Sequence, residues 1–172
     1  MNRLLLELTG GDRRSIGKSN LVARKVLDDP LCFAVIIGGL HHGDPLVRMR
    51  CADVTEKVSL AHPEWLAPYK QTLLDLAAKS PEQELRWHLA QMLPRLNLDH
   101  KDQRQVVTIM DGYLDDKSSI VKTSAMQALA DIAINDVALR RKLLPLFTGI
   151  ARKGSPAMRA RARKLIVQMS DR

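Results

Sequence analysis

The sequence predicts an all-α fold, an α-solenoid superhelix of about five antiparallel helix pairs. The first observation behind this prediction is a five-residue motif: an apolar residue, then Arg or Lys, two variable residues, and a small or apolar residue. The motif begins at Val47, Leu85, Val121 and Met158, so successive copies are 38, 36 and 37 residues apart. A constant period of this length is typical of helical repeats.

The second observation is the apolar spacing that each motif opens. Apolar residues recur at i, i+4, i+7 and i+11 in all four copies, which places them in one stripe along an α-helix. The stripes are Val47, Cys51, Val54 and Val58; Leu85, Leu89, Met92 and Leu96; Val121, Ala125, Ala128 and Ile132; and Met158, Ala162, Leu165 and Met169.

The third observation is a turn signal before each motif. Ser or Asp caps a helix start, and Pro is accepted at the first helical position. The signals are Gly43-Asp44-Pro45, Ser80-Pro81, Asp115-Asp116-Lys117-Ser118 and Gly154-Ser155-Pro156. Upstream of each turn lies an apolar segment that predicts the first helix of the pair, at residues 30–41, 63–79, 101–114 and 137–152.

A weaker fifth copy opens the chain, with a short helix at residues 2–9 and a second helix within 13–27. Asn20 falls where the pattern expects an apolar residue, as is common in a terminal repeat that caps the stack. We therefore expect a single domain over residues 1–172. It consists of a degenerate cap repeat at 1–28 and repeats at 29–61, 62–97, 98–135 and 136–172.

The segment Gly43-Asp44-Pro45-Leu46-Val47-Arg48 and its three counterparts resemble HEAT repeats, a family of armadillo-type α-solenoids. The resemblance implies a right-handed superhelix with a concave binding surface lined by the second helices, and it implies no reaction. The family also carries an Asp six residues before the motif Arg, which forms a ladder between repeats. Only Asp116, before Lys122, matches this pattern, so Arg48, Arg86 and Arg159 are expected to find other partners or face water.

Composition places the chain among soluble proteins: of 172 residues, 45% are hydrophobic and 27% charged. No apolar run is long enough to span a membrane, and the N-terminal apolar run is too short for a secretory signal. Cys32 and Cys51 are too few for a disulfide framework and fit a reducing compartment. We therefore expect a cytoplasmic protein with inert, buried thiols.

The net charge of +8 is unevenly distributed: residues 1–136 carry a net charge of −1 and residues 137–172 a net charge of +9. Asp171 is the single acidic residue in the second range. A basic segment attracts nucleic acid, anionic lipid or acidic protein, and it is equally well explained as a solvated helix face. The last helix concentrates these cations, with Arg159, Arg161, Arg163 and Lys164.

Motifs for chemistry are weak. The segment from Gly10 to Ser19 looks like a phosphate-binding loop, but Asp12 occupies the position where that loop needs its first Gly. The five histidines show no metal-ligand spacing, and no nucleophile motif occurs. We therefore expect no enzyme activity, no metal and no cofactor.

The expected partner-binding residues lie on the second helices. Trp87 is about 200° from Leu85 around its helix, far from the buried stripe, with Gln91 one turn later and Met49 at the same position of the previous repeat. The alternative is that Trp87 packs between neighbouring second helices. A second candidate is a column of cations, one or two in each repeat, that could follow a phosphate backbone: Arg48, Arg86, Lys122 and Arg159, with Arg50, His88 and Arg161 two residues further on.

These observations predict a non-enzymatic scaffold or adaptor. A protein or peptide would bind Met49, Trp87 and Gln91 on the concave face, beside a basic end formed by Arg159, Arg161, Arg163 and Lys164. The alternative is a nucleic-acid-binding protein, similar to the HEAT-like alkylpurine DNA glycosylases. Gln91 stands where their catalysis needs an acid, so we expect no catalysis of that type. A helper of another enzyme, like the HEAT-like chromophore lyases, is a third hypothesis.

Overall fold

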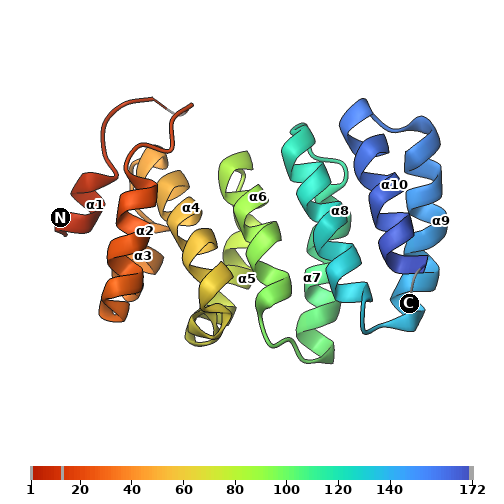
Figure 1. The fold of residues 1–172 in the computed structure, drawn as a ribbon, viewed down its shortest axis with the longest axis horizontal. Helices are drawn as coiled ribbons and strands as arrows, with labels where there is room; N and C mark the ends of the chain where they lie inside the picture. Colours follow the sequence, from red (N-terminus) through yellow and green to blue (C-terminus); the bar gives the residue numbers. More distant parts are fainter. Residues whose placement is uncertain (1, 13, 171–172) are drawn as a thin grey trace. The chain divides into compact units, whose positions relative to one another are not determined.

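The computed structural model describes residues 2–12 and 14–170, and every regular element within these ranges is helical (Figure 1). The predicted all-α class is confirmed. Residue 13 of the predicted second helix of the cap repeat, and Asp171 of the basic segment, lie outside the described residues. The chain divides into two compact units, Met1–Leu73 and Leu74–Arg172. The division falls within α5 (Lys70–Lys79), inside the predicted repeat 62–97.

The first unit is built around α4 (Pro45–Ala61), which packs against α2 (Ser19–Asp28), α3 (Phe33–Gly39) and the 3₁₀ segment η2 (Pro63–Tyr69). The short α1 (Arg3–Glu7) packs on α3, and the 3₁₀ turn η1 (Pro30–Cys32) precedes α3. Asp44 caps α4 as predicted, because its side chain accepts a hydrogen bond from the Leu46 N–H at 2.9 Å.

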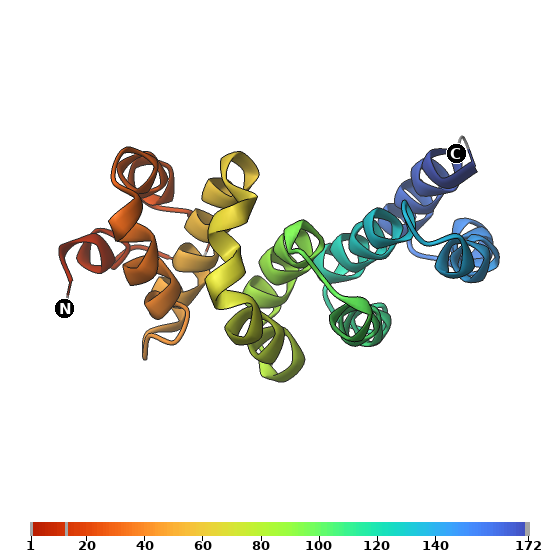
Figure 2. The same cartoon turned by 90° about the horizontal axis from the view of Figure 1, so that it is seen from below.

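The second unit consists of α6 (Gln83–Met92), the 3₁₀ turn η3 (Leu93–Arg95), α7 (His100–Tyr113), α8 (Ser119–Ala133), α9 (Val137–Lys153) and α10 (Pro156–Ser170). Within it, α6, α7, α9 and α10 all contact α8, and α9 also packs against α10. Figure 2 shows α6, α8 and α10 in one layer and α7 and α9 in a second layer. The predicted pairing of a first and a second helix is thus seen in α7 with α8 and in α9 with α10.

The predicted apolar stripes are buried. Every stripe residue of all four copies is at most 9% exposed except Ile132, which is half-buried. Burial of the stripes stabilises the fold, since a fully buried Val, Leu or Met side chain contributes about 1.5–3 kcal/mol.

The start of α6 differs from the prediction. The Ser80-Pro81 signal predicts a helix from Pro81, but α6 begins at Gln83. The reason is that the Ser80 hydroxyl accepts a hydrogen bond from the Glu82 N–H at 3.2 Å, which forms a turn before the helix rather than a cap on it. Pro94 then ends the α-helix early, because proline has no N–H to continue the ladder.

The glycine-rich segment near the N-terminus wraps around a buried cation. Arg50 of α4 is only 2% exposed, and its Nη1 donates to the carbonyl oxygens of Leu8 at 2.8 Å and Gly10 at 2.7 Å. Its Nη2 and Nε donate to the Ser15 carbonyl at 3.2 and 3.3 Å. A phosphate-binding loop points amide N–H groups at an anion, whereas this loop points carbonyl oxygens at a guanidinium. The resemblance to a phosphate-binding loop is therefore a false signal.

We predict that the stripe tolerates no charge. Ala125→Asp, at a position that is fully buried in α8, should lower the free energy of unfolding by about 3 kcal/mol or more, because an unpaired carboxylate would be buried. Ile120→Asp is the matched control, since Ile120 is 52% exposed in the first turn of the same helix. Equal melting temperatures for the two variants would contradict the burial of the stripe.

We also predict a difference between two loop glycines that both have positive φ. Gly10 (φ 73°) has open space where a Cβ would lie, whereas a Cβ on Gly17 (φ 53°) would lie 2.7 Å from Arg50 Cζ. Gly10→Ala should therefore cost only the left-handed backbone strain, about 1–2 kcal/mol. Gly17→Ala should cost at least about 1 kcal/mol more in urea unfolding, because the loop must open around Arg50. Equal losses would mean that Arg50 does not hold the loop.

Candidate partner-binding surfaces

The face of α6 that carries Trp87 and Gln91 is partly open. Gln91 is exposed and Trp87 is half-buried, with its ring tilted against the neighbouring His88 ring at 5.4 Å between centroids. The two side chains are one helical turn apart and so lie on the same side of α6. Trp87 is therefore neither a core aromatic nor a freely solvated one, and its open part is available for contact.

A chain of hydrogen bonds lies on α8 and α10 in the same layer. Arg161 Nη1 donates to Gln127 Oε1 at 2.8 Å, and Gln127 Nε2 donates to Asp131 Oδ1 at 2.8 Å. Gln168 Nε2 donates to the same Asp131 oxygen at 3.5 Å. Arg161, predicted as part of the basic end, is thus tied to α8 by a hydrogen bond. Sequence reasoning missed the chain, although Gln127 follows Gln91 by 36 residues, one repeat period.

Met49 does not belong to an open surface. It is 6% exposed, so the expectation of an exposed methionine is wrong. The reason is that α2, α3 and η2 all pack against α4, and residues on most sides of this helix are buried. The position opposite the stripe is thus hidden on α4 but partly open on α6, where Trp87 occupies it.

Two of the motif arginines, Arg48 and Arg86, hold the turns that precede their own helices. Arg48 Nη1 donates to the carbonyl oxygens of His42 and Gly43, and Arg86 Nε donates to the Ser80 carbonyl at 2.8 Å. In both cases a carbonyl six residues upstream accepts the bond. A structural role therefore explains the arginine at this position in α4 and in α6.

Arg86 also makes an ion pair. Its Nη1 lies 2.6 Å from Asp116 Oδ2, and its guanidinium lies over the Tyr113 ring, 5.3 Å from the centroid. Burial raises the pKa of Asp116, but hydrogen bonds from the Ser118 N–H and from Arg86 outweigh it and hold that pKa below its usual value. Asp116 therefore pairs with Arg86, the motif arginine 36 residues before Lys122.

The second column of cations is not a surface for phosphates. Arg50 is 2% exposed, His88 is 8% exposed and Arg161 is half-buried. These residues are three positions after the first residue of the stripe, which places them about 60° from it around the helix, at the edge of the buried face. The expectation of a continuous basic column is wrong at these positions.

The basic end is largely exposed. Residues 137–170 contain nine Lys and Arg and no Asp or Glu. On α10 the predicted residues Arg159, Arg163 and Lys164 are exposed, and α9 adds exposed cations that the sequence analysis did not single out: Arg141, Lys142, Arg152 and Lys153. This helix pair therefore has a strongly positive surface.

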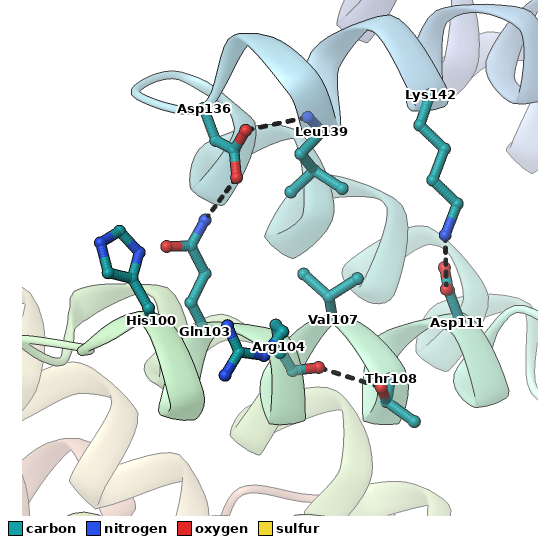
Figure 3. Close-up of a pocket in the computed structure, with 9 residues that line it drawn as sticks. All are labelled: His100, Gln103, Arg104, Val107, Thr108, Asp111, Asp136, Leu139 and Lys142. Atoms are coloured by element: carbon teal, nitrogen blue, oxygen red, sulfur yellow. Dashed lines mark hydrogen bonds and ion pairs between the residues drawn. The ribbon is translucent and has the colours of Figure 1, made fainter.

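A cleft of about 450 Å³ lies between α7 and α9 and was not predicted (Figure 3). At one end Asp136 caps α9, since its carboxylate accepts from the Leu139 N–H at 2.9 Å and from Gln103 Nε2 at 3.0 Å. At the other end Lys142 of α9 points toward Asp111 of α7, with 3.8 Å between Nζ and Oδ2. The lining residues are His100, Gln103, Arg104, Val107, Thr108, Asp111, Asp136, Leu139 and Lys142.

The described part of the chain has neither a metal-binding cluster nor a reactive thiol. It holds no group of three or more His, Cys, Asp or Glu side chains placed to bind a metal ion. Burial raises the pKa of the Cys51 thiol to about 12, and the hydrogen bond to Asp29 raises that of Cys32. Both thiols are thus poor nucleophiles at neutral pH. None of the described helices is long and apolar enough to cross a bilayer.

Comparisons with known proteins give a fold and no function. No protein-family model and no curated protein matches the chain. Among solved structures, the chain is similar to a crystal structure of an engineered protein, with a TM-score of 0.67 and 16% sequence identity. The match covers 98% of this chain and 78% of the engineered one. At this identity the similarity extends to the fold alone.

We predict that two arginines at the same motif position differ in effect. Arg86→Ala should lower the free energy of unfolding by about 2 kcal/mol, because it leaves the Asp116 carboxylate, 7% exposed, without its cation. Arg159→Ala should change stability by less than about 0.5 kcal/mol, because Arg159 is exposed. Chemical denaturation measures both, and a similar loss for the two variants would rule out the structural role of the Arg86 pair.

Proposed function

We propose that this protein is a non-enzymatic HEAT-like solenoid scaffold or adaptor, and that it binds a protein or peptide on the layer formed by α6, α8 and α10. The fold part of the proposal is supported by the four buried stripes at a common period and by the two-layer packing of the second unit. Cytoplasmic localisation is part of the proposal and is supported by the two free cysteines.

The observation that carries the binding proposal is the surface of the second-helix layer. It combines a half-open Trp87, an exposed Gln91 and a hydrogen-bonded chain from Arg161 through Gln127 to Asp131. Tryptophan is enriched among the residues that contribute most to binding. Polar groups that are already held in place lose little conformational entropy when a partner binds. An extended peptide offers backbone groups that Gln91 and Gln127 could bond with their amides.

A second candidate function is nucleic-acid binding. The exposed cations of α9 and α10, with no acidic residue between positions 137 and 170, favour it. Against it, the aromatic residue in this range, Phe147, is fully buried, so the basic end has no ring on which bases could stack.

The proposal is tested with Trp87→Ala. Partners are captured from a native lysate with and without nuclease, and the recovered partner is then titrated against each variant. We expect Trp87→Ala to weaken binding by more than about 1 kcal/mol with a small change in melting temperature. Val137→Ala is the control, since it removes exposed apolar surface from α9, outside the layer formed by α6, α8 and α10.

Three outcomes would contradict the proposal. One is a large loss of stability in Trp87→Ala with unchanged binding, which would make Trp87 a core residue. A second is equal weakening by Val137→Ala. The third is a nuclease-sensitive partner whose binding is abolished by Arg159→Glu and Arg163→Glu, which would favour nucleic acid.

A further inference from the structure

A second depression lies further along α9 than the cleft between α7 and α9. This depression, of about 510 Å³, is lined by Pro145, Leu146, Gly149, Ile150, Lys153 and Gly154. Around the α9 axis, Leu146, Gly149 and Lys153 lie within about 40° of Lys142, which faces Asp111 of α7. The two depressions therefore lie on the same side of α9. From Asp136 to Lys153 they extend over about 25 Å.

The floor of this groove is apolar. Val107 of α7 and Leu139 of α9 line the first part, and Leu146 and Ile150 line the second. Leu146 is 40% exposed although it lies on a helix that packs against two others. Gly149 leaves open space, because a Cβ built on it would meet nothing within 4 Å. The groove thus has one apolar patch on each side of the Lys142–Asp111 pair and has room for side chains of a partner.

The ends of the groove are positive. The carboxylate of Asp136 is occupied by the Leu139 N–H and by Gln103, and Asp111 faces Lys142. Within the described residues, Arg104 at one end and Lys153 at the other make no side-chain hydrogen bond or ion pair. An occupant therefore meets two apolar patches beside the unpaired cations Arg104 and Lys153, which is complementary to acidic residues that flank an apolar stripe.

We infer that the groove between α7 and α9 binds an acidic amphipathic helix of a partner protein. A helix of about 17 residues spans the groove, and its apolar stripe would cover Val107, Leu139 and Leu146 while its Asp or Glu side chains pair with Arg104 and Lys153. This surface lies on the first-helix layer, so it is separate from the layer that carries Trp87.

The inference is tested with three labelled synthetic peptides of about 18 residues. The first carries Leu at i, i+3, i+4 and i+7 with Glu on the flanks; the second replaces Glu with Lys, and the third replaces Leu with Ser. Fluorescence anisotropy at about 0.15 M salt measures binding to the full chain. We expect the Leu/Glu peptide to bind at least about tenfold more tightly than the other two.

Two glycine variants then locate the site. Gly149→Glu places a carboxylate in the groove and should weaken binding of the Leu/Glu peptide at least about tenfold. Gly112→Glu is the matched control: Gly112 also has open space at its Cβ and lies on α7, about 140° around the helix from Val107. Circular dichroism melts confirm that both variants fold.

The inference is overturned if the three peptides bind alike or none binds, or if Gly149→Glu and Gly112→Glu have the same effect. It is also overturned if a duplex DNA of about 20 base pairs binds more tightly than the Leu/Glu peptide and loses affinity in Gly149→Glu, since the groove would then be part of a nucleic-acid surface.

Discussion

The burial of one apolar stripe on each second helix is the constraint on which the rest of the structure depends. Once Val47, Cys51, Val54 and Val58 face inward on α4, the direction of every other side chain on that helix follows from the helical angle. The same holds for α6, α8 and α10. On α4 and α6, the residue that directly follows the first stripe residue reaches back to the preceding turn. The residue three positions after the first stripe residue lies at the edge of the core. Both positions hold cations in several repeats, so the fold must supply acceptors for them.

The groups that accept hydrogen bonds from these cations differ between repeats. Arg50 donates hydrogen bonds to the backbone carbonyl oxygens of Leu8, Gly10 and Ser15. These bonds hold the glycine-rich loop against α4. Arg86 donates to the Asp116 carboxylate and to the Ser80 carbonyl oxygen, and Arg161 donates to the side-chain amide oxygen of Gln127. A buried guanidinium with several hydrogen-bond acceptors is stable, whereas the same group without acceptors would be costly. Arg50, Arg86 and Arg161 therefore hold the fold together, and the exposed cations of α9 and α10 remain available for recognition.

The helices, their order and the buried stripes could be predicted from the sequence, because period and apolar spacing are local properties of the chain. The site could be predicted only in part. Trp87 and Gln91 lie on a partly open face as expected, but Met49 is hidden because three elements cover α4, and no local pattern shows how many neighbours a helix has. The cage around Arg50 joins residues about 40 positions apart in sequence through backbone carbonyls, which leave no trace in residue type. The groove between α7 and α9 likewise depends on the spacing of two helices, which packing decides.

This arrangement gives the second unit two separate surfaces, a polar and aromatic one on α6, α8 and α10 and a cationic groove on α7 and α9. Central to the structure is that cations at the edge of the stripe are internal, so that they are not part of either surface's exposed charge. Nuclear magnetic resonance of the arginine side chains tests this claim most directly. The account predicts that the guanidinium protons of Arg50 exchange slowly with water and give separate resonances, while those of the exposed Arg159 exchange rapidly. Rapid exchange at Arg50, equal to that of Arg159, would contradict it.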